Sequence, residues 1–248
     1  MRFLFVAIVA LALRTYLFGQ EGAEHRPGIA FSVQLTALPG APEPLISADL
    51  RERTIAAIRE RLAVFGEKNI GLSAAGDDRV ICQITGLTVS GLDRARELLQ
   101  RRAVVEMRMV AKNSDAILNG VVPFDPEYIP MKRTSPAGSI LVSKKVLLGS
   151  PQIRRATPFF ANKAWTIDLG LTEAGAKMFS CVMRAHANKE MAITLDGEVA
   201  ASVRLQSTPE NALLRIPVPL GEAETRDLAT AAEHPFEVGV KILDEAKF

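Results

Sequence analysis

Residues 54–87 read TIAAIRERLAVFGEKNIGLSAAGDDRVICQITGL, and the same stretch closes with RRAVVEMRMV at 101–110. The first part predicts a helix, because apolar residues recur at spacings of three and four: Ile55, Ile58, Leu62 and Phe65. Two short strands are expected at 69–74 and 79–85. They are joined by Gly76-Asp77-Asp78, since Gly and Asp tolerate the backbone angles of a tight turn.

A second helix and a strand complete this stretch. The helix begins near Ser90, and Leu92, Ala95, Leu98 and Leu99 form its apolar face. Apolar and charged residues then alternate over 105–109, which is typical of a half-buried strand. With a further strand at 28–36, the order is strand, helix, strand, strand, helix, strand. We therefore expect an α+β fold with a ferredoxin-like base (βαββαβ) over residues 28–111.

These motifs resemble the first periplasmic domain of SecD, an accessory membrane protein of the bacterial Sec export machinery. The shared pattern is an Arg-bearing helix ending in Phe-Gly, a G-D-D-R turn, a strand ending in Gly, and an E-x-R strand. It falls on Arg59, Gly66, Gly76, Asp78, Arg79, Gly86, Ala103, Glu106 and Arg108. Further similarity lies in LTEAGAKMF at 171–179 and in MAITLDGEVA at 191–200. The resemblance covers roughly residues 28–246. The sequence departs from SecD at two points. Gly28 alone remains of a D-L-x-G-G signature, and Ser202 stands where SecD has a proline after the hairpin.

The resemblance implies an inserted head subdomain. Residues 112–138 are rich in proline and have little periodicity, so we predict a linker there. Residues 139–234 then form an α+β head. The alternation of Phe236, Val238, Val240 and Ile242 predicts a strand in 235–248 that returns to the sheet of the base.

The N-terminus carries an apolar run of eleven residues, Phe3 to Leu13, between Arg2 and Arg14. This run is too short for a spanning helix, which needs about 20 apolar residues, and it fits the apolar core of a signal peptide. We predict that residues 1–19 are a signal peptide or, alternatively, an uncleaved membrane anchor, and that 20–27 form a tether. Downstream of this run the sequence predicts no further membrane-spanning segment.

Composition sets broad limits. The chain has 248 residues, of which 48% are apolar and 23% charged, and its net charge is +2. These values are ordinary for a globular protein, and the charge balance gives no reason to expect a nucleic-acid partner. Two cysteines cannot form a disulfide framework.

The chain lacks a recognisable catalytic or metal-binding pattern. Three histidines (His25, His186 and His234) are scattered, without the short gaps typical of metal ligands. Cys82 and Cys181 are predicted to be buried free thiols, with a disulfide between the subdomains as the alternative. A basic flank made of Arg94, Arg96, Arg101 and Arg102 is expected to be a solvated helix face, with anionic lipid or a partner as the alternative. We predict no catalytic, cofactor-binding or metal-binding residues.

The expected function follows from the resemblance and from this lack of catalytic groups. We predict a non-enzymatic, periplasmic binding module that assists protein export by contacting unfolded secreted polypeptide at the outer face of the inner membrane. The chain ends where the membrane helices of SecD would continue, so translocase subunits of the SecF and SecYEG type are expected partners, and inner-membrane contact is expected as well. The alternative is an envelope scaffold that keeps the SecD periplasmic fold without a role in translocation.

Overall fold

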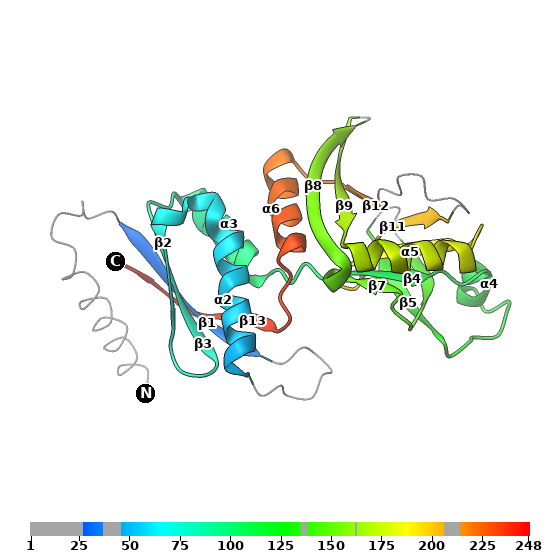
Figure 1. Ribbon diagram of the computed structural model, residues 1–248, viewed down its shortest axis with the longest axis horizontal. Helices are drawn as coiled ribbons and strands as arrows, with labels where there is room; N and C mark the ends of the chain where they lie inside the picture. The colour runs from blue at the N-terminus through cyan, green and yellow to red at the C-terminus, as the bar shows by residue number, and fades with distance from the viewer. Residues whose placement is uncertain (1–26, 37–45, 135–137, 162, 206–213) are drawn as a thin grey trace.

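Two units of mixed α and β structure follow one another along the long axis of the molecule (Figure 1). The computed structural model describes residues 27–36, 46–134, 138–161, 163–205 and 214–248. The predicted signal peptide or anchor at 1–19, and the tether up to residue 26, lie outside the described residues. In the described part of the chain, no helix combines the length and the apolarity needed to cross a bilayer.

The first unit, which we call the base, is a four-stranded antiparallel sheet in the order β13-β1-β3-β2. Its elements are β1 (Gly28–Thr36), α2 (Ala48–Leu62), β2 (Ile70–Ala74), β3 (Arg79–Thr85), α3 (Val89–Gln100) and β13 (Gly239–Lys247). Phe31 and Val33 of β1 share one buried cluster with Ile58 of α2 and Leu98 of α3. The apolar stripes of both helices therefore pack on the same face of the sheet.

The strand at 105–109 does not complete this sheet, so that prediction is wrong. The segment forms β4 (Val105–Met109), but β4 pairs with β10 and β7 in another sheet. The place beside β1 is occupied by β13, which pairs with β1 from Ile29–Lys247 to Thr36–Gly239. The edge of β1 can pair with only one further strand, and β13, which is longer than β4, occupies it. Period-2 alternation predicts a strand but does not specify which sheet it joins.

The second unit, which we call the head, contains a six-stranded sheet (β6-β5-β11-β10-β4-β7) and a three-stranded sheet (β12-β9-β8). Its elements are β4, α4 (Ser114–Leu118), β5 (Tyr128–Arg133), β6 (Gly138–Ser143), β7 (Leu148–Gly149), β8 (Ile153–Ala161), β9 (Ala164–Leu171), α5 (Glu173–Ala185), β10 (Glu190–Leu195), β11 (Glu198–Arg204), β12 (Leu214–Val218) and α6 (Glu222–Glu233). One large apolar cluster joins the two sheets to α5 and α6. It is separate from the cluster of the base.

The predicted linker at 112–138 is partly a strand, which is a second correction. β5 lies inside it and pairs with β6 from Tyr128–Ser143 to Arg133–Gly138. Its prolines predicted a loop, yet Pro130 is part of the ladder, opposite Leu141. On its other side β5 meets β11 through the single pair Val199–Arg133. A strand with a mostly unpaired edge tolerates proline, because few backbone N–H groups are needed there.

Candidate functional site

The chain crosses between base and head twice, and the two crossings lie next to each other. The first runs from α3 to β4 through residues 101–104, and the second runs from α6 to β13 through residues 234–238. The backbone N–H of Phe236 donates to the carbonyl of Arg102 at 3.2 Å. We call this region the junction.

Arg61 lies at the centre of the junction, and its side chain is 1% exposed. Its guanidinium Nε donates to the carbonyl of His234 at 2.8 Å, and Nη2 donates to that of Arg102 at 2.8 Å. The same group stacks over the ring of Phe236, 3.5 Å from the centroid. It also donates to three carbonyls at or beyond the ends of α3 and α6, those of Leu98, Arg101 and Ala231.

This arrangement matches a cation to the negative ends of two helices. The last carbonyls of a helix have no partner inside the helix, and they carry the negative end of its dipole. Burial lowers the pKa of Arg61 to about 9, while Asp196 acts in the opposite direction. The side chain is therefore still a cation at neutral pH. An amphipathic pattern assigns a charged residue such as Arg61 to a polar face of its helix, whereas the structure buries it. Its spacing of three from Ile58 was the available signal.

A second contact between the units is the ion pair of Arg94 on α3 with Asp227 on α6. Nε and Nη2 of Arg94 donate to the two carboxylate oxygens at 2.5 and 2.6 Å. The hydrogen bonds with Asp227 raise the pKa of Arg94. Such bidentate geometry fixes the relative direction of the two helices.

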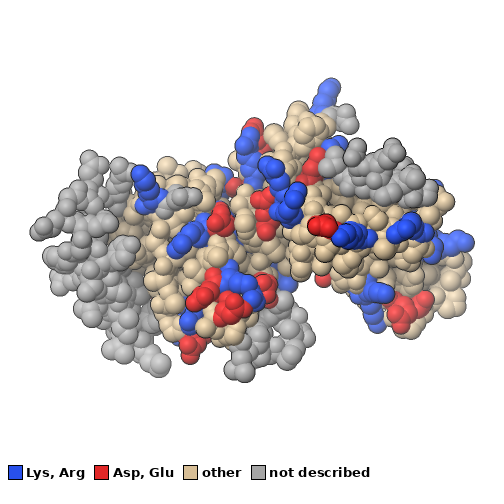
Figure 2. Space-filling view, in the orientation of Figure 1, with Lys and Arg blue, Asp and Glu red and all other residues tan. Residues whose placement is uncertain are grey.

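The predicted basic flank is thus largely paired with carboxylates. Arg96 donates to both oxygens of Glu245 on β13 at 2.6 Å and lowers the pKa of that carboxyl, and Arg101 pairs with Glu97 at 3.2 Å. Figure 2 shows basic and acidic side chains interspersed over α2 and α3. A face of mixed sign gives weak attraction to anionic surfaces, so this part of α3 is not a basic patch.

The head carries an open apolar groove of about 510 Å³ between α5 and the segment that joins β6 to β7. Met178 and Val182 line it from α5, and Val146 and Leu147 line it from the opposite side. Met178 is 44% exposed and Val146 is 39% exposed. Exposed apolar side chains that gather in a concave surface are typical of a binding site.

The local sequence explains how α5 presents this groove. The hydroxyl of Thr172 caps the helix by accepting a hydrogen bond from Gly175 N–H at 3.0 Å. Phe179 and Met183 are buried in the head core, so Met178 and Val182 lie on a neighbouring face. Two lysines lie at the rim of the groove, Lys145 on one side and Lys177 on the other, and Lys177 pairs with Glu173 at 2.7 Å. The sequence pattern missed this groove, because the segment 145–147 lies far from α5 along the chain.

The two cysteines differ in environment, and the prediction that both are buried is wrong for one of them. Cys82 is buried in the base, and burial raises the pKa of its thiol to about 12. Cys181 is exposed and lines the groove. Both thiols are free, so the alternative of a disulfide between the subdomains is wrong.

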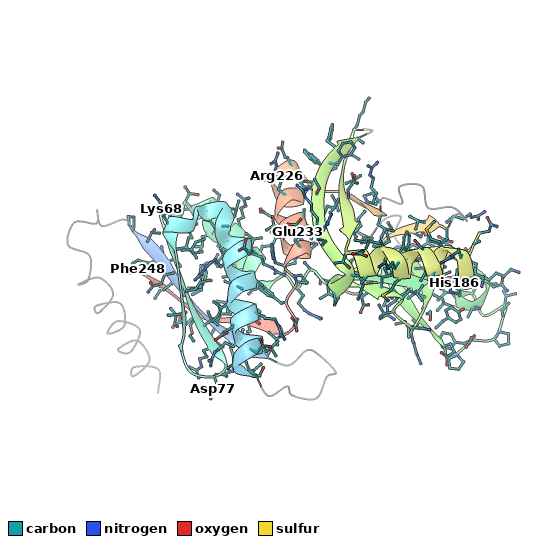
Figure 3. The ribbon with its side chains drawn as sticks, in the orientation of Figure 1. Lys68, Asp77, His186, Arg226, Glu233 and Phe248 are labelled. Atoms are coloured by element: carbon teal, nitrogen blue, oxygen red, sulfur yellow. The ribbon has the colours of Figure 1, made fainter. Side chains whose placement is uncertain are left out.

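Among the described residues, the histidines and the turn aspartate that the sequence analysis considered do not come together in one site. His186 ends α5 and His234 ends α6, whereas His25 lies outside the described residues. Asp77 lies at the tip of the β2–β3 hairpin in Figure 3, as its turn chemistry predicts. Across the described ranges, no three His, Cys, Asp or Glu side chains gather in a way that could hold a metal ion.

Most of the head matches a known subdomain. Residues 127–233 match the SecDF P1 head subdomain. The chain is 27% identical over 186 residues to the SecD translocase subunit of Magnetococcus marinus, covering 72% of this chain and 35% of that protein. It is 26% identical over 234 residues to SecD of Syntrophobacter fumaroxidans, covering 90% and 43% respectively. The resemblance to SecD is therefore confirmed, and the chain spans less than half the length of these curated relatives.

Solved structures show the same fold. A structure described as a membrane component SecDF that enhances protein export superposes with a TM-score of 0.67 at 20% identity, over 87% of this chain and 98% of that chain. SecDF in a super-membrane-facing form gives a TM-score of 0.69 at 20% identity, over 89% and 30%. The molecule thus has the α+β fold of a SecDF periplasmic domain.

Proposed function

We propose that this chain is a SecD-like, non-enzymatic binding module that assists protein export at the outer face of the inner membrane. The observation that carries the proposal is the apolar groove on α5, which lies within the segment that matches the SecDF head. An unfolded secreted polypeptide exposes apolar side chains that a folded protein buries. An open apolar groove can bind such segments with little sequence preference, and methionine suits this task because its side chain adapts to different shapes.

The base has the role of a support in this proposal. We propose that the base is a ferredoxin-like unit in which β13 is the last strand, and its strand order β13-β1-β3-β2 supports this proposal. Arg61 and the pair Arg94–Asp227 hold the head against this unit. We propose that residues 1–19 direct the chain to the periplasm as a signal peptide or anchor, and that the chain works with translocase subunits of the SecF and SecYEG type.

The groove is tested by the substitution Met178→Asp, which places a charge in its apolar lining. We expect binding of a reduced, unfolded secretory protein, measured by fluorescence anisotropy, to weaken by about tenfold, because an apolar segment that covers the new carboxylate must remove water from it. Val121→Asp is the matched control, since Val121 is 77% exposed and lies outside the groove. Equal binding by both variants would refute the groove as the polypeptide site.

The alternative is an envelope scaffold that has kept the fold without a role in export. Two sequence departures favour it: Gly28 alone remains of the D-L-x-G-G signature, and Ser202 stands where SecD has a proline. In-cell crosslinking of the tagged chain, followed by mass spectrometry, separates the two functions. Translocase subunits or nascent secreted chains support the export role, whereas envelope proteins alone support the scaffold.

A further inference from the structure

The hairpin of β8 and β9 presents aromatic rings on both of its faces near its tip. Phe160 and Trp165 are cross-strand partners on one face, with ring centroids 5.1 Å apart, and Trp165 is half-buried against the apolar cluster of the head. Phe159 lies on the opposite face, because neighbouring residues of a strand alternate, and it pairs with Thr166. Phe159 and Phe160 are 46% and 55% exposed. In Figure 1 the hairpin extends beyond the rest of the head. We call Phe159, Phe160, Lys163 and Trp165 the aromatic tip.

The backbone of the hairpin leaves few places for an added strand. The ladder between β8 and β9 extends to the pair Ala161–Ala164. On the outer edge of β8, the N–H of Ala156 donates to the carboxylate of Glu233 at 2.7 Å, and Figure 3 places Glu233 on α6 where it faces β8. Two residues along the same edge, Pro158 has no N–H to offer. These features are known ways to block edge pairing, so the aromatic tip is not explained by strand addition.

The exposed charged groups of the hairpin are basic. Lys163 is exposed at its tip, whereas Arg154 and Arg155 are exposed at its opposite end. The single carboxylate among the hairpin's described residues is Asp168, and Arg215 neutralises it through two hydrogen bonds of 2.6 and 2.8 Å. The guanidinium of Arg215 also lies 4.9 Å from the ring centroid of Phe159. The aromatic tip therefore combines two exposed phenylalanine rings with one exposed cation, Lys163.

We propose that the aromatic tip inserts into the headgroup region of an anionic lipid membrane. Rings on opposite faces of a thin hairpin cannot both be covered by one flat protein surface, whereas the lipid interface surrounds an inserted tip on every side. Aromatic side chains favour that interface, and lysine and arginine are attracted to anionic headgroups. The backbone groups of β8 that have no partner on its outer edge can stay hydrated there, because it is the hydrocarbon core of the bilayer, and not the headgroup region, that lacks water. This inference does not depend on the proposed polypeptide groove.

Trp165 makes a local test possible, because it is the only tryptophan in the sequence. Vesicle binding by the whole chain is no test, since the apolar N-terminal run would itself associate with lipid. The full chain is therefore reconstituted into phosphatidylglycerol vesicles with plain or brominated acyl chains, and Trp165 emission is compared. We expect roughly a twofold loss of Trp165 emission in the brominated phosphatidylglycerol vesicles. The loss should be smaller in brominated phosphatidylcholine vesicles, which are zwitterionic, and smaller in about 0.5 M salt, which screens the surface charge.

Two variants give the controls. Phe159→Ser combined with Phe160→Ser should abolish the quenching, whereas Phe124→Ser should leave it unchanged, because Phe124 is 57% exposed but lies in the segment between α4 and β5. The ratio between brominated and plain vesicles is taken for each variant, so a change in the intrinsic emission of Trp165 cancels. Equal emission of the native chain in both vesicle types would overturn the proposal. Quenching of equal size in the double variant would overturn it as well. A shift of Trp165 emission with unfolded polypeptide, but not with vesicles, would assign the aromatic tip to a protein partner instead.

Discussion

Arg61 shows how much one residue can do when it lies where two helices end. Its five hydrogen bonds all go to backbone carbonyls, and they come from both crossings of the chain. A neutral side chain of similar length could fill the space, but it would leave these carbonyls buried without donors. The cost of unmade hydrogen bonds is larger than the gain from making them.

We therefore predict that Arg61→Met lowers the free energy of unfolding by about 3 kcal/mol, in the range found when one member of a buried charged network is removed. The measurement is urea unfolding followed by circular dichroism. Arg59→Met is the matched control, since Arg59 is exposed on the same helix, and its effect should stay within about 0.5 kcal/mol. Similar losses in both variants would show that the junction contacts contribute no special stability.

The role of Arg61 could not be predicted from the amphipathic pattern, which assigns charged residues to the solvent face. The carbonyls that Arg61 binds belong to α3 and to α6, and residue 231 is far from residue 61 along the chain. Only the folded arrangement brings these helix ends together. By contrast, the turn at Asp77 depends on local chemistry, and the sequence predicted it correctly.

Among whole elements, long helices and hairpins were predictable, and strand partners were not. The helices α2, α3, α5 and α6 follow their apolar periodicity, and the β10–β11 hairpin follows its Asp196-Gly197 turn. The partner of β4 could not be predicted, because alternation of apolar residues fits any half-buried sheet. β5 was missed because its proline content favours loops in general, whereas the mostly unpaired edge of this particular strand tolerates proline.

Gly175 in the first turn of α5 leads to an element-scale prediction. A Cβ at this position would lie 2.7 Å from the carbonyl oxygen of Gln152, closer than such atoms approach. We expect Gly175→Ala to push α5 away from this segment and to destabilise the chain by about 1–3 kcal/mol, as overpacking does.

Thermal unfolding measures this effect, with Gly170→Ala as the control. At Gly170 the nearest atom to an added Cβ is 3.6 Å away, which is an ordinary contact, so its effect should be below about 1 kcal/mol. A Gly175→Ala variant as stable as the native chain would mean that α5 can shift without cost, and the groove that it lines would then have no fixed shape.

At the scale of the whole molecule, the main apolar cluster of the head and the cluster of the base are separate among the described residues, and polar contacts at the junction link the two units. The cluster of the base is smaller than that of the head, and stability rises with the apolar area that a unit buries. We therefore predict that the base unfolds at lower urea concentration than the head.

Two natural reporters distinguish the units in one sample. Trp165 packs against the head cluster and reports its unfolding by fluorescence. Cys82 is buried in the base, where burial raises the pKa of its thiol to about 12, so it should react with maleimide only after the base opens. Cys181→Ser removes the exposed thiol from the background. Coincident midpoints for the two reporters would show that the junction makes base and head a single cooperative unit.

The hydrogen bond between the N–H of Phe236 and the carbonyl of Arg102 has an evolutionary consequence. The chain leaves the base and returns to it at neighbouring points, so the whole segment 103–235 has its two ends close together. A segment whose two ends lie close together can be inserted into another fold with little rearrangement of that fold, so such insertions are well tolerated. A recombination that joined residue 102 directly to residue 236 would leave a continuous strand, helix, hairpin, helix and strand. The base can thus be regarded as a host fold, and the head as an insert within it.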